Sequence, residues 1–142
     1  MPTLGEIRTR FSHDRFATEA AQIEIVEARP GYAKVQMPLT PIHRNMRGAP
    51  MGGAIFTLAD FAAAVAANGH AVDTDTISLH ADITFLSAAK GTCLIAEAKC
   101  IKQGRSTSLF EVDVRDDLGT QVAHACVNGF VLRKTEQKAE NT

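Results

Sequence analysis

The chain has 142 residues, and 45% of them are hydrophobic, enough for one buried core but not for two. Its 15 basic and 16 acidic residues almost cancel, so the whole molecule has no strong field to attract nucleic acid or an anionic bilayer. The first twenty residues lack a long apolar stretch, and the apolar run near residue 54 is interrupted by Asp60 and too short to span a bilayer. We therefore expect one domain over residues 1–142, located in the cytoplasm, with no nucleic-acid or membrane partner.

The three cysteines, Cys93, Cys100 and Cys126, are an odd number and show no C-x-x-C pairing. We expect reduced thiols, as in the cytosol. His80 and His124 each fall on an expected strand, without a second ligand at a useful spacing. The sequence therefore predicts neither a metal site nor a bound cofactor.

The first third of the chain predicts a helix and a β-hairpin. Apolar residues recur at helical spacing from Leu4 to Phe11, which indicates a short amphipathic helix within residues 1–18, at the periphery of the fold. Residues 23–28 are largely apolar, and residues 33–39 alternate apolar and polar side chains. An Arg-Pro-Gly turn separates these two segments, so we expect them to pair as a hairpin.

A loop over residues 41–53 leads to residues 54–67, where seven of the fourteen positions are alanine, the best helix former. This helix is apolar nearly all round, so we expect it to be enclosed, and Asn68-Gly69 to end it. Strand patterns and a polar tail follow, at residues 76–85, 92–101, 105–115, 120–132 and 134–142. The whole pattern predicts an α+β fold in which an antiparallel β-sheet wraps around one long central helix.

Asp60 is the most informative residue, because a carboxylate in an enclosed helix is costly to bury unless it is paired, hydrated or functional. The alternative is that this part of the helix reaches solvent and that Asp60 is a surface charge. Gly52 and Gly53 stand where the loop becomes the helix, so their backbone N–H groups lack intrahelical partners and could polarise a carbonyl oxygen. On its own, however, a glycine pair is more commonly a flexible junction.

The spacing Asn45-x6-Gly52-Gly53-x6-Asp60 resembles that of the PaaI-type hotdog-fold acyl-CoA thioesterases. The likeness continues downstream through the expected strands. It implies the hotdog fold, with two subunits joined into one continuous sheet. It also implies a homodimer and, commonly, a homotetramer of two such dimers.

The resemblance further implies a catalytic role for each matching residue. Gly53 donates its amide to the thioester oxygen, and Asp60 attacks the thioester or activates water. Asn45 lines the same site, near the thioester and the lytic water. Ser78 helps to hold the carboxylate or the water, although an ordinary outward-facing strand residue would look the same in sequence.

Met51 departs from the family motif, which usually reads His-Gly-Gly where this chain has Met51-Gly52-Gly53. If the histidine only shapes the loop, hydrolysis survives with a modified pocket. If it assists catalysis, the protein is slow or only binds its ligand. Met51 offers a flexible apolar side chain that could line an acyl pocket. His43 lies eight residues earlier and does not replace the histidine by spacing, so we expect a loop histidine.

We expect six residues to bind the substrate: Gly52, Met51 and Phe61 at the helix, and Lys102, Gly104 and Arg105 at a hairpin. Phe61 would suit the hydrophobic core equally well. The two hairpin cations flank a tight turn, which offers charge and free amides to the phosphates of CoA. A solvated hairpin tip is the alternative interpretation.

Together these features predict an acyl-CoA thioesterase that releases a free acid and CoA from an aryl or medium-chain acyl-CoA. Gly53 and Asp60 lie seven residues apart on one helix, a rise of about 10 Å, so we expect a partner subunit to supply one of them. Residue types leave open whether Asp60 attacks directly or acts as a general base. A non-catalytic acyl-CoA-binding module or sensor is the main alternative. A hotdog dehydratase would need a histidine that does not accompany Asp60.

Overall fold

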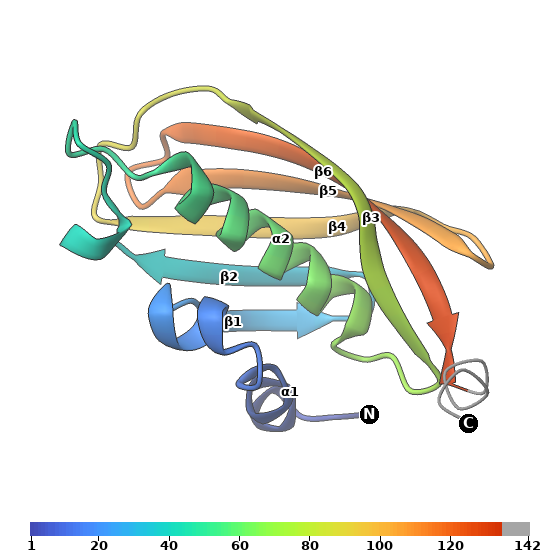
Figure 1. Cartoon of the computed structure of the whole chain (residues 1–142). Helices are drawn as coiled ribbons and strands as arrows, with labels where there is room; N and C mark the ends of the chain where they lie inside the picture. Colours follow the sequence, from blue (N-terminus) through green and yellow to red (C-terminus); the bar gives the residue numbers. More distant parts are fainter. Residues whose placement is uncertain (135–142) are drawn as a thin grey trace.

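The computed structural model describes residues 1–134, so all but the first residue of the tail predicted at 134–142 lies outside the described residues. The elements are α1 (Leu4–Phe11), the π-helical turn η1 (Phe16–Ala20), β1 (Glu24–Arg29), β2 (Tyr32–Pro38), the 3-10 turn η2 (Pro41–His43), α2 (Gly52–Asn68), β3 (Thr74–Phe85), β4 (Cys93–Gln103), β5 (Thr107–Asp116) and β6 (Gln121–Arg133). The strands form one antiparallel sheet in the order β1-β2-β4-β5-β6-β3, and α2 lies across one face of it (Figure 1). The predicted α+β architecture is confirmed.

The central helix α2 buries one side against the sheet and leaves the other side partly open. Leu58 and Val65 are fully buried, whereas Gly53 and Phe56 are exposed. Truncating a core side chain such as Leu58 to alanine would cost about 2–5 kcal/mol, because the sheet and helix could not close the cavity. The prediction of an enclosed helix is therefore right for one side only. Asp60 is half-buried and borders the open side.

The end of α2 is fixed by a side chain. Asn68 Oδ1 accepts the backbone N–H of Thr76 at 2.7 Å, and Asn68 Nδ2 donates to the Thr76 carbonyl at 3.0 Å. Gly69 follows in the ordinary right-handed helical conformation, not in the left-handed one that glycine favours at helix ends. The predicted stop is therefore in the right place, but Asn68 makes it by joining the helix to β3.

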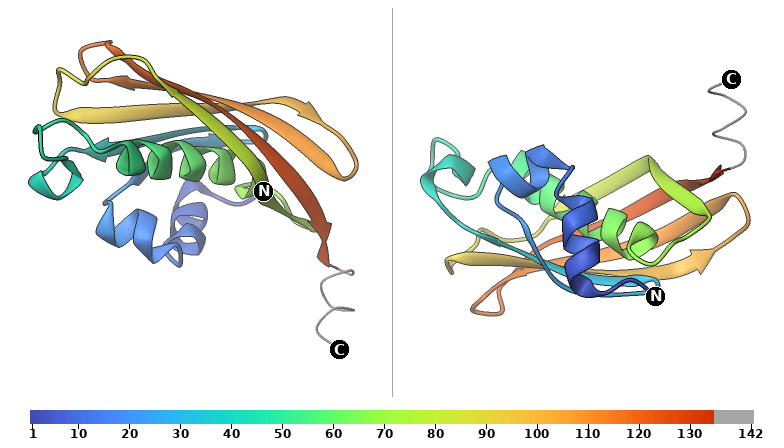
Figure 2. Two further views of the ribbon diagram at one scale, coloured as in Figure 1. Left: turned by 45° about the horizontal axis from the view of Figure 1, so that its top comes forward. Right: turned by 90° about the horizontal axis from the view of Figure 1, so that it is seen from below.

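The N-terminal segment contributes to the core, which corrects the prediction that it is peripheral. Thr3 and Glu6 form a capping box at the start of α1. Ile7 and Phe11 are buried, and the Phe11 ring meets Phe61 edge to face, with ring centroids 5.8 Å apart. Figure 2 shows α1 and η1 beside α2, on the side away from most of the sheet. The helix predicted within residues 1–18 ends at Phe11, and η1 is a separate turn.

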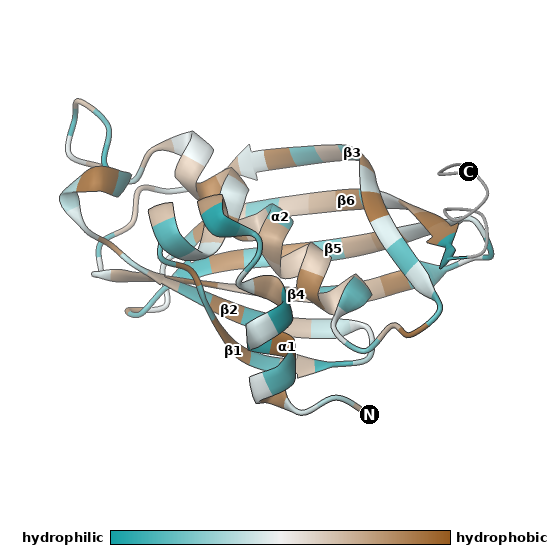
Figure 3. Ribbon diagram, turned by 60° about the horizontal axis from the view of Figure 1, so that its bottom comes forward, coloured by the Kyte–Doolittle hydropathy of each residue, from teal (hydrophilic) through white to brown (hydrophobic). Residues whose placement is uncertain are grey.

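The two edges of the sheet differ. On β1 the Arg8 side chain donates from Nε and Nη2 to the Ile25 carbonyl, at 3.0 and 2.8 Å, so α1 covers that edge. On the opposite edge β3 pairs, within residues 1–134, only with β6. Hydrophobic and hydrophilic residues alternate along β3 (Figure 3), and its Ile77 and Leu79 are exposed. An uncovered strand of this length is a template for pairing with another chain.

A buried carboxylate secures the loop between β3 and β4. Asp116 is almost completely buried, and its two oxygens accept the backbone N–H groups of Lys90, Gly91, Leu118 and Thr120 at 2.8–3.0 Å. Burial alone would raise the pKa of Asp116, but these amides outweigh it and hold the pKa well below its usual range. The carboxylate is therefore charged in the folded protein and joins two loops.

Candidate active site

The start of α2 presents two backbone N–H groups without partners. Met51 precedes the helix as its N-cap, and its carbonyl accepts the amides of Ala54 and Ile55 at 3.0 and 3.1 Å. Within residues 1–134, the amides of Gly52 and Gly53 have no acceptor, as is usual for the first positions of a helix. These donors also sit at the positive end of the helix dipole. A carbonyl oxygen that gains negative charge would be stabilised here.

The two glycines serve different purposes. A Cβ atom on Gly52 would come within 3.2 Å of the Phe85 ring, so glycine allows the end of β3 to contact the helix start. A Cβ atom on Gly53 would meet nothing within 4 Å. The space beside the Cα atom of Gly53 is therefore open, whereas Gly52 borders a separate recess with Phe85.

Among the residues that the structure describes, Asp60 has one hydrogen-bonded side-chain partner, Ser78. The Ser78 hydroxyl donates to Asp60 Oδ1 at 3.0 Å, from β3 to α2. Asp60 borders an open depression of about 460 Å³ that Phe16 and Phe56 also line. Phe61, expected at the substrate, is only 3% exposed and contributes to the floor of this depression from within the core. The carboxylate is thus held in a fixed position and remains accessible.

Gly53 and Asp60 share one side of α2 but do not meet within the chain. Seven residues are almost two helical turns, so the two groups lie about 10 Å apart along the axis. Thr57 lies between them, and its hydroxyl donates to the Gly53 carbonyl at 2.8 Å. A single carbonyl cannot contact both groups of one chain, because each contact requires about 3 Å.

Asn45 shapes the loop that precedes α2. The side-chain oxygen Oδ1 accepts the backbone N–H groups of Arg47 and Ala49, at 3.0 and 3.2 Å. The backbone N–H of Asn45 donates to the Ala49 carbonyl at 2.8 Å. The side chain is exposed, and no hydrogen bond among the described residues joins it to Gly53 or Asp60. The structure therefore shows Asn45 as a loop organiser, and its contact with substrate stays a prediction.

The hairpin residues lie at the end of the sheet that adjoins the C-terminus of α2. Gly104 donates to the Thr107 carbonyl at 2.8 Å and closes the tip, with Lys102 and Arg105 exposed on either side. The tip is joined to β6, because Val131 donates to the Ser106 carbonyl at 2.8 Å. Within one chain, the tip of the β4–β5 hairpin lies near the C-terminal end of α2, and α2 begins at the opposite end of the sheet (Figure 1).

His43, expected from the sequence to be a loop histidine, has a structural role that its position in the sequence does not indicate. It is 3% exposed, its Nδ1 accepts the Thr40 amide at 3.0 Å, and its Nε2 donates to the Ala21 carbonyl at 2.6 Å. The Thr40 bond requires an unprotonated Nδ1, so the proton is on Nε2. His43 thereby joins the N-terminal segment to the loop, which no local pattern could have indicated.

Other nucleophiles and metal ligands are poorly placed. Burial raises the pKa of the Cys93, Cys100 and Cys126 thiols, which disfavours thiolate. His124 lies between two carboxylates, with Nδ1 2.8 Å from Asp113 Oδ1. In the described part of the chain no group of three or more His, Cys, Asp or Glu side chains could hold a metal ion. No helix among residues 1–134 is long and apolar enough to cross a membrane.

Comparison with known proteins places this arrangement in a family. The model of the thioesterase superfamily matches residues 48–123, more than half of the chain. The chain belongs to the thioesterase superfamily. It is also 35% identical, over 119 residues, to a proposed esterase of Archaeoglobus fulgidus, an alignment that covers 83% of this chain and 75% of the relative. The matched region includes Gly53, Asp60 and Ser78, whereas Asn45 precedes it.

Solved structures support the PaaI-type hotdog fold of this thioesterase. The PaaI protein of Escherichia coli, from the phenylacetic acid degradation operon, superimposes with a TM-score of 0.78 at 24% identity, over 92% of this chain and 96% of that one. A Streptococcus mutans protein solved with acetyl-CoA has a TM-score of 0.73 at 27% identity, over 79% of this chain and 90% of that one. The chain is thus a hotdog thioester hydrolase, as its sequence predicts.

Proposed function

We propose that the protein hydrolyses acyl-CoA thioesters to a free acid and CoA, in sites that each combine Gly53 of one subunit with Asp60 of another. The observation that carries the proposal is a pair of groups on the open side of α2: the Gly53 amide, which has no acceptor within residues 1–134, and the half-buried Asp60 carboxylate, which accepts a hydrogen bond from Ser78. The two groups are too far apart to act together in one chain. The acetyl-CoA bound to the related Streptococcus mutans protein supports CoA as the leaving group.

A dimer with a two-fold axis could bring Gly53 and Asp60 of different subunits together. If two α2 helices lie antiparallel, Gly53 of each faces Asp60 of the other when the axis passes midway, between Phe56 and Thr57. Phe56 is exposed and Thr57 is half-buried, so this part of the helix is available for contact. The symmetry then creates two equal sites per dimer.

The sheet supports the same assembly. β3 is the edge left uncovered within residues 1–134, and antiparallel pairing of two β3 strands would extend the sheet across the dimer and bring the exposed Ile77 and Leu79 beside the partner strand. On the edge formed by β1, Arg8 already occupies the Ile25 carbonyl. The homotetramer implied by the family resemblance, and the location in the cytoplasm, stay predictions.

The same symmetry would place the hairpin cations at the site. Lys102 and Arg105 lie at the C-terminal end of their own α2, so an antiparallel partner would bring them toward the end that carries Gly53. CoA phosphates would then contact the chain that contributes Asp60, while the thioester oxygen contacts the other chain. This division agrees with an extended ligand that reaches from the hairpin to the helix start.

The reaction follows from these positions. The Gly53 amide would stabilise the oxyanion as a carbon–oxygen bond forms at the thioester carbonyl. Asp60 would supply that oxygen itself or remove the proton from the attacking water. Ser78 would hold the carboxylate in position. Collapse of the intermediate breaks the carbon–sulfur bond, and CoA leaves as a thiolate. With Asp60 as the base, the thiolate takes up the proton that Asp60 removed from the water, and the free acid forms directly. With Asp60 as the nucleophile, an acyl anhydride of Asp60 remains, and water then hydrolyses it to the free acid and the Asp60 carboxylate and supplies the proton of the thiolate.

Release of free CoA from a panel of aryl and alkyl acyl-CoAs tests the proposal. We expect Asp60→Asn to lower kcat by at least ~10²-fold while acyl-CoA binding persists, because the charge is lost and the side-chain size is kept. Leu118→Ala, which removes an exposed apolar side chain from the turn between β5 and β6, is the control. Near wild-type turnover by Asp60→Asn would contradict the assignment, and binding without turnover in the wild type would indicate a sensor.

A further inference from the structure

An apolar recess opens beside Gly53. It has a volume of about 290 Å³ and is lined by residues from η1, η2 and the start of α2. Three of these are large hydrophobic side chains that are unusually exposed: Phe16 at 71%, Ile42 at 75% and Met51 at 56%. Exposed apolar side chains scattered singly are common, but a group around one recess indicates a binding surface.

The polar side chains in the recess wall are already satisfied within the chain. Both ring nitrogens of His43 are hydrogen-bonded, to Thr40 and to Ala21. The hydroxyl proton of Thr57 is donated to the Gly53 carbonyl. Neither side chain has a proton left for a ligand, so the recess favours an apolar occupant. A hydroxylated or charged group in the recess would lose its hydration without gaining a hydrogen bond from a side chain, and the free Gly53 amide is taken up by the thioester oxygen.

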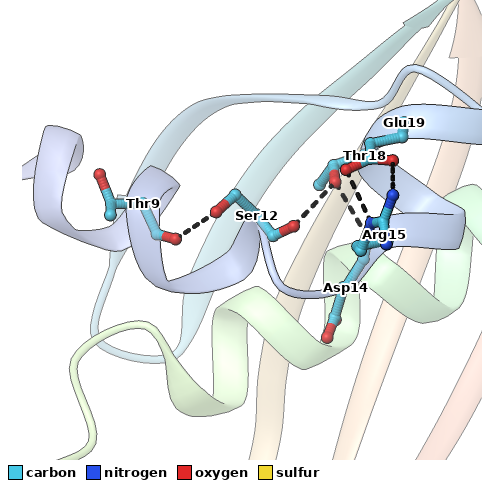
Figure 4. A network of polar contacts seen from close by, with 6 residues as sticks. All are labelled: Thr9, Ser12, Asp14, Arg15, Thr18 and Glu19. Atoms are coloured by element: carbon cyan, nitrogen blue, oxygen red, sulfur yellow. Dashed lines mark hydrogen bonds and ion pairs between the residues drawn. The ribbon is translucent and has the colours of Figure 1, made fainter.

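The outer wall of the recess is held by the N-terminal segment. Figure 4 shows the polar contacts of this turn: Thr18 Oγ1 donates to the Asp14 carbonyl at 3.0 Å, and Arg15 and Glu19 form an ion pair. The amide of Ile23 then donates to the Ala17 carbonyl at 3.0 Å. These contacts and the His43 bond fix the backbone that carries Phe16, so the wall is preformed.

We infer that this recess is the acyl subsite, and that Phe16, Ile42 and Met51 select for apolar acyl groups of medium length. A dry cavity of about 150 Å³ is large enough for benzene, so 290 Å³ suits an alkyl or arylalkyl group of roughly six to ten carbons. Met51 adapts to either shape because its thioether chain is unbranched. The inference rests on the proposed thioester hydrolysis, because the Gly53 amide would bind the thioester oxygen and so place the first carbon of the acyl group at the recess.

The test is the dependence of kcat/KM on acyl length, measured with acetyl-, hexanoyl-, octanoyl-, decanoyl- and phenylacetyl-CoA. Phe16→Ala and Met51→Ala remove apolar contacts, and Ala20→Phe places a ring in the recess. We expect each to lower the octanoyl-to-acetyl ratio of kcat/KM by at least ~5-fold, since one or two lost methylene contacts already change specificity by about tenfold. Leu118→Ala, equally exposed at 70%, should leave the ratio unchanged.

Several outcomes would overturn the inference. If Ala20→Phe hydrolyses all chain lengths as the wild type does, the acyl group lies elsewhere, for example in the recess beside Phe85, although hydrolysis itself stands. If the Phe16 and Ala20 variants change only the oligomeric state, measured by light scattering, a second subunit covers this surface. If the wild type hydrolyses none of the esters, the proposed function fails. In that case the acyl subsite is tested by comparing the affinity of the protein for the octyl-CoA thioether with its affinity for CoA. Binding of octyl-CoA at least ~5-fold tighter than CoA, with the difference abolished by Ala20→Phe, would support the subsite. Equal affinities for the two ligands would refute it.

Discussion

Mixing a Gly53→Pro chain with an Asp60→Asn chain tests whether each active site uses two subunits. Proline removes the amide proton of Gly53 and is tolerated in the first turn of a helix, where no intrahelical bond depends on that proton. Gly53→Ala is the matched control, because it keeps the amide and its Cβ would meet nothing within 4 Å. Asp60→Asn keeps the shape of the side chain and its reach to Ser78.

The expected magnitudes follow from the geometry. Loss of one oxyanion donor lowers kcat by about 10²–10³-fold, and loss of the carboxylate by at least ~10²-fold, so both homodimers should retain at most about 1% of wild-type activity. In a mixed dimer one site carries both lesions, while the other has an intact Gly53 from one chain and an intact Asp60 from the other. Random pairing gives about half mixed dimers, so about a quarter of the activity should return.

The assay is CoA release after the two variants are unfolded together and refolded, with separately refolded proteins mixed as the control. Recovery should follow subunit exchange, monitored by mass spectrometry of intact dimers. A site within one chain would always carry one lesion, so it predicts no recovery. If mixed dimers form and activity stays near 1%, the shared site is refuted.

The remaining predictions concern the carboxylate, the hairpin and the loop anchor. Ser78→Ala should lower kcat about tenfold with little change in KM, because the Asp60 carboxylate loses its bond from the Ser78 hydroxyl; an unchanged kcat would make the serine an ordinary strand residue. Arg105→Ala should raise KM for CoA esters but not for N-acetylcysteamine esters, which lack the nucleotide, and an equal rise for both would indicate folding damage. Asp116→Asn should lower the Tm at neutral pH, because the folded state holds the pKa of Asp116 below its value in the unfolded chain. The stabilisation by the charged carboxylate is complete above about pH 4, and it is lost as the pH falls through the pKa of the folded state. Thermal melts should therefore show the two Tm values converging in acid, and a constant gap would contradict this origin.

Local sequence pattern was sufficient for the main helices and the strands of this protein, but not for the short turns η1 and η2. The alanine-rich run and the glycine pair located α2 to within two residues at either end, since propensity and helix-end chemistry act over short distances. Period-two alternation located β3, because successive side chains of a strand face opposite sides of the sheet. The separation of Gly53 and Asp60 also followed from sequence, since helix rise is fixed per residue.

Only the tertiary structure decided which surfaces are open. β3 follows α2 in the chain yet lies beside β6, so its place at the edge could not be derived from the order of strands. The open side of α2 depends on where the N-terminal segment packs, and Phe11, expected at the periphery, is buried against Phe61. Phe16 is 26 residues from Ile42, and Ile42 and Met51 lie in a loop without a regular period, so only folding brings the three around one recess. The sequence determined what each segment is, because those interactions are local, and the fold decided what each segment faces, because those contacts join distant residues.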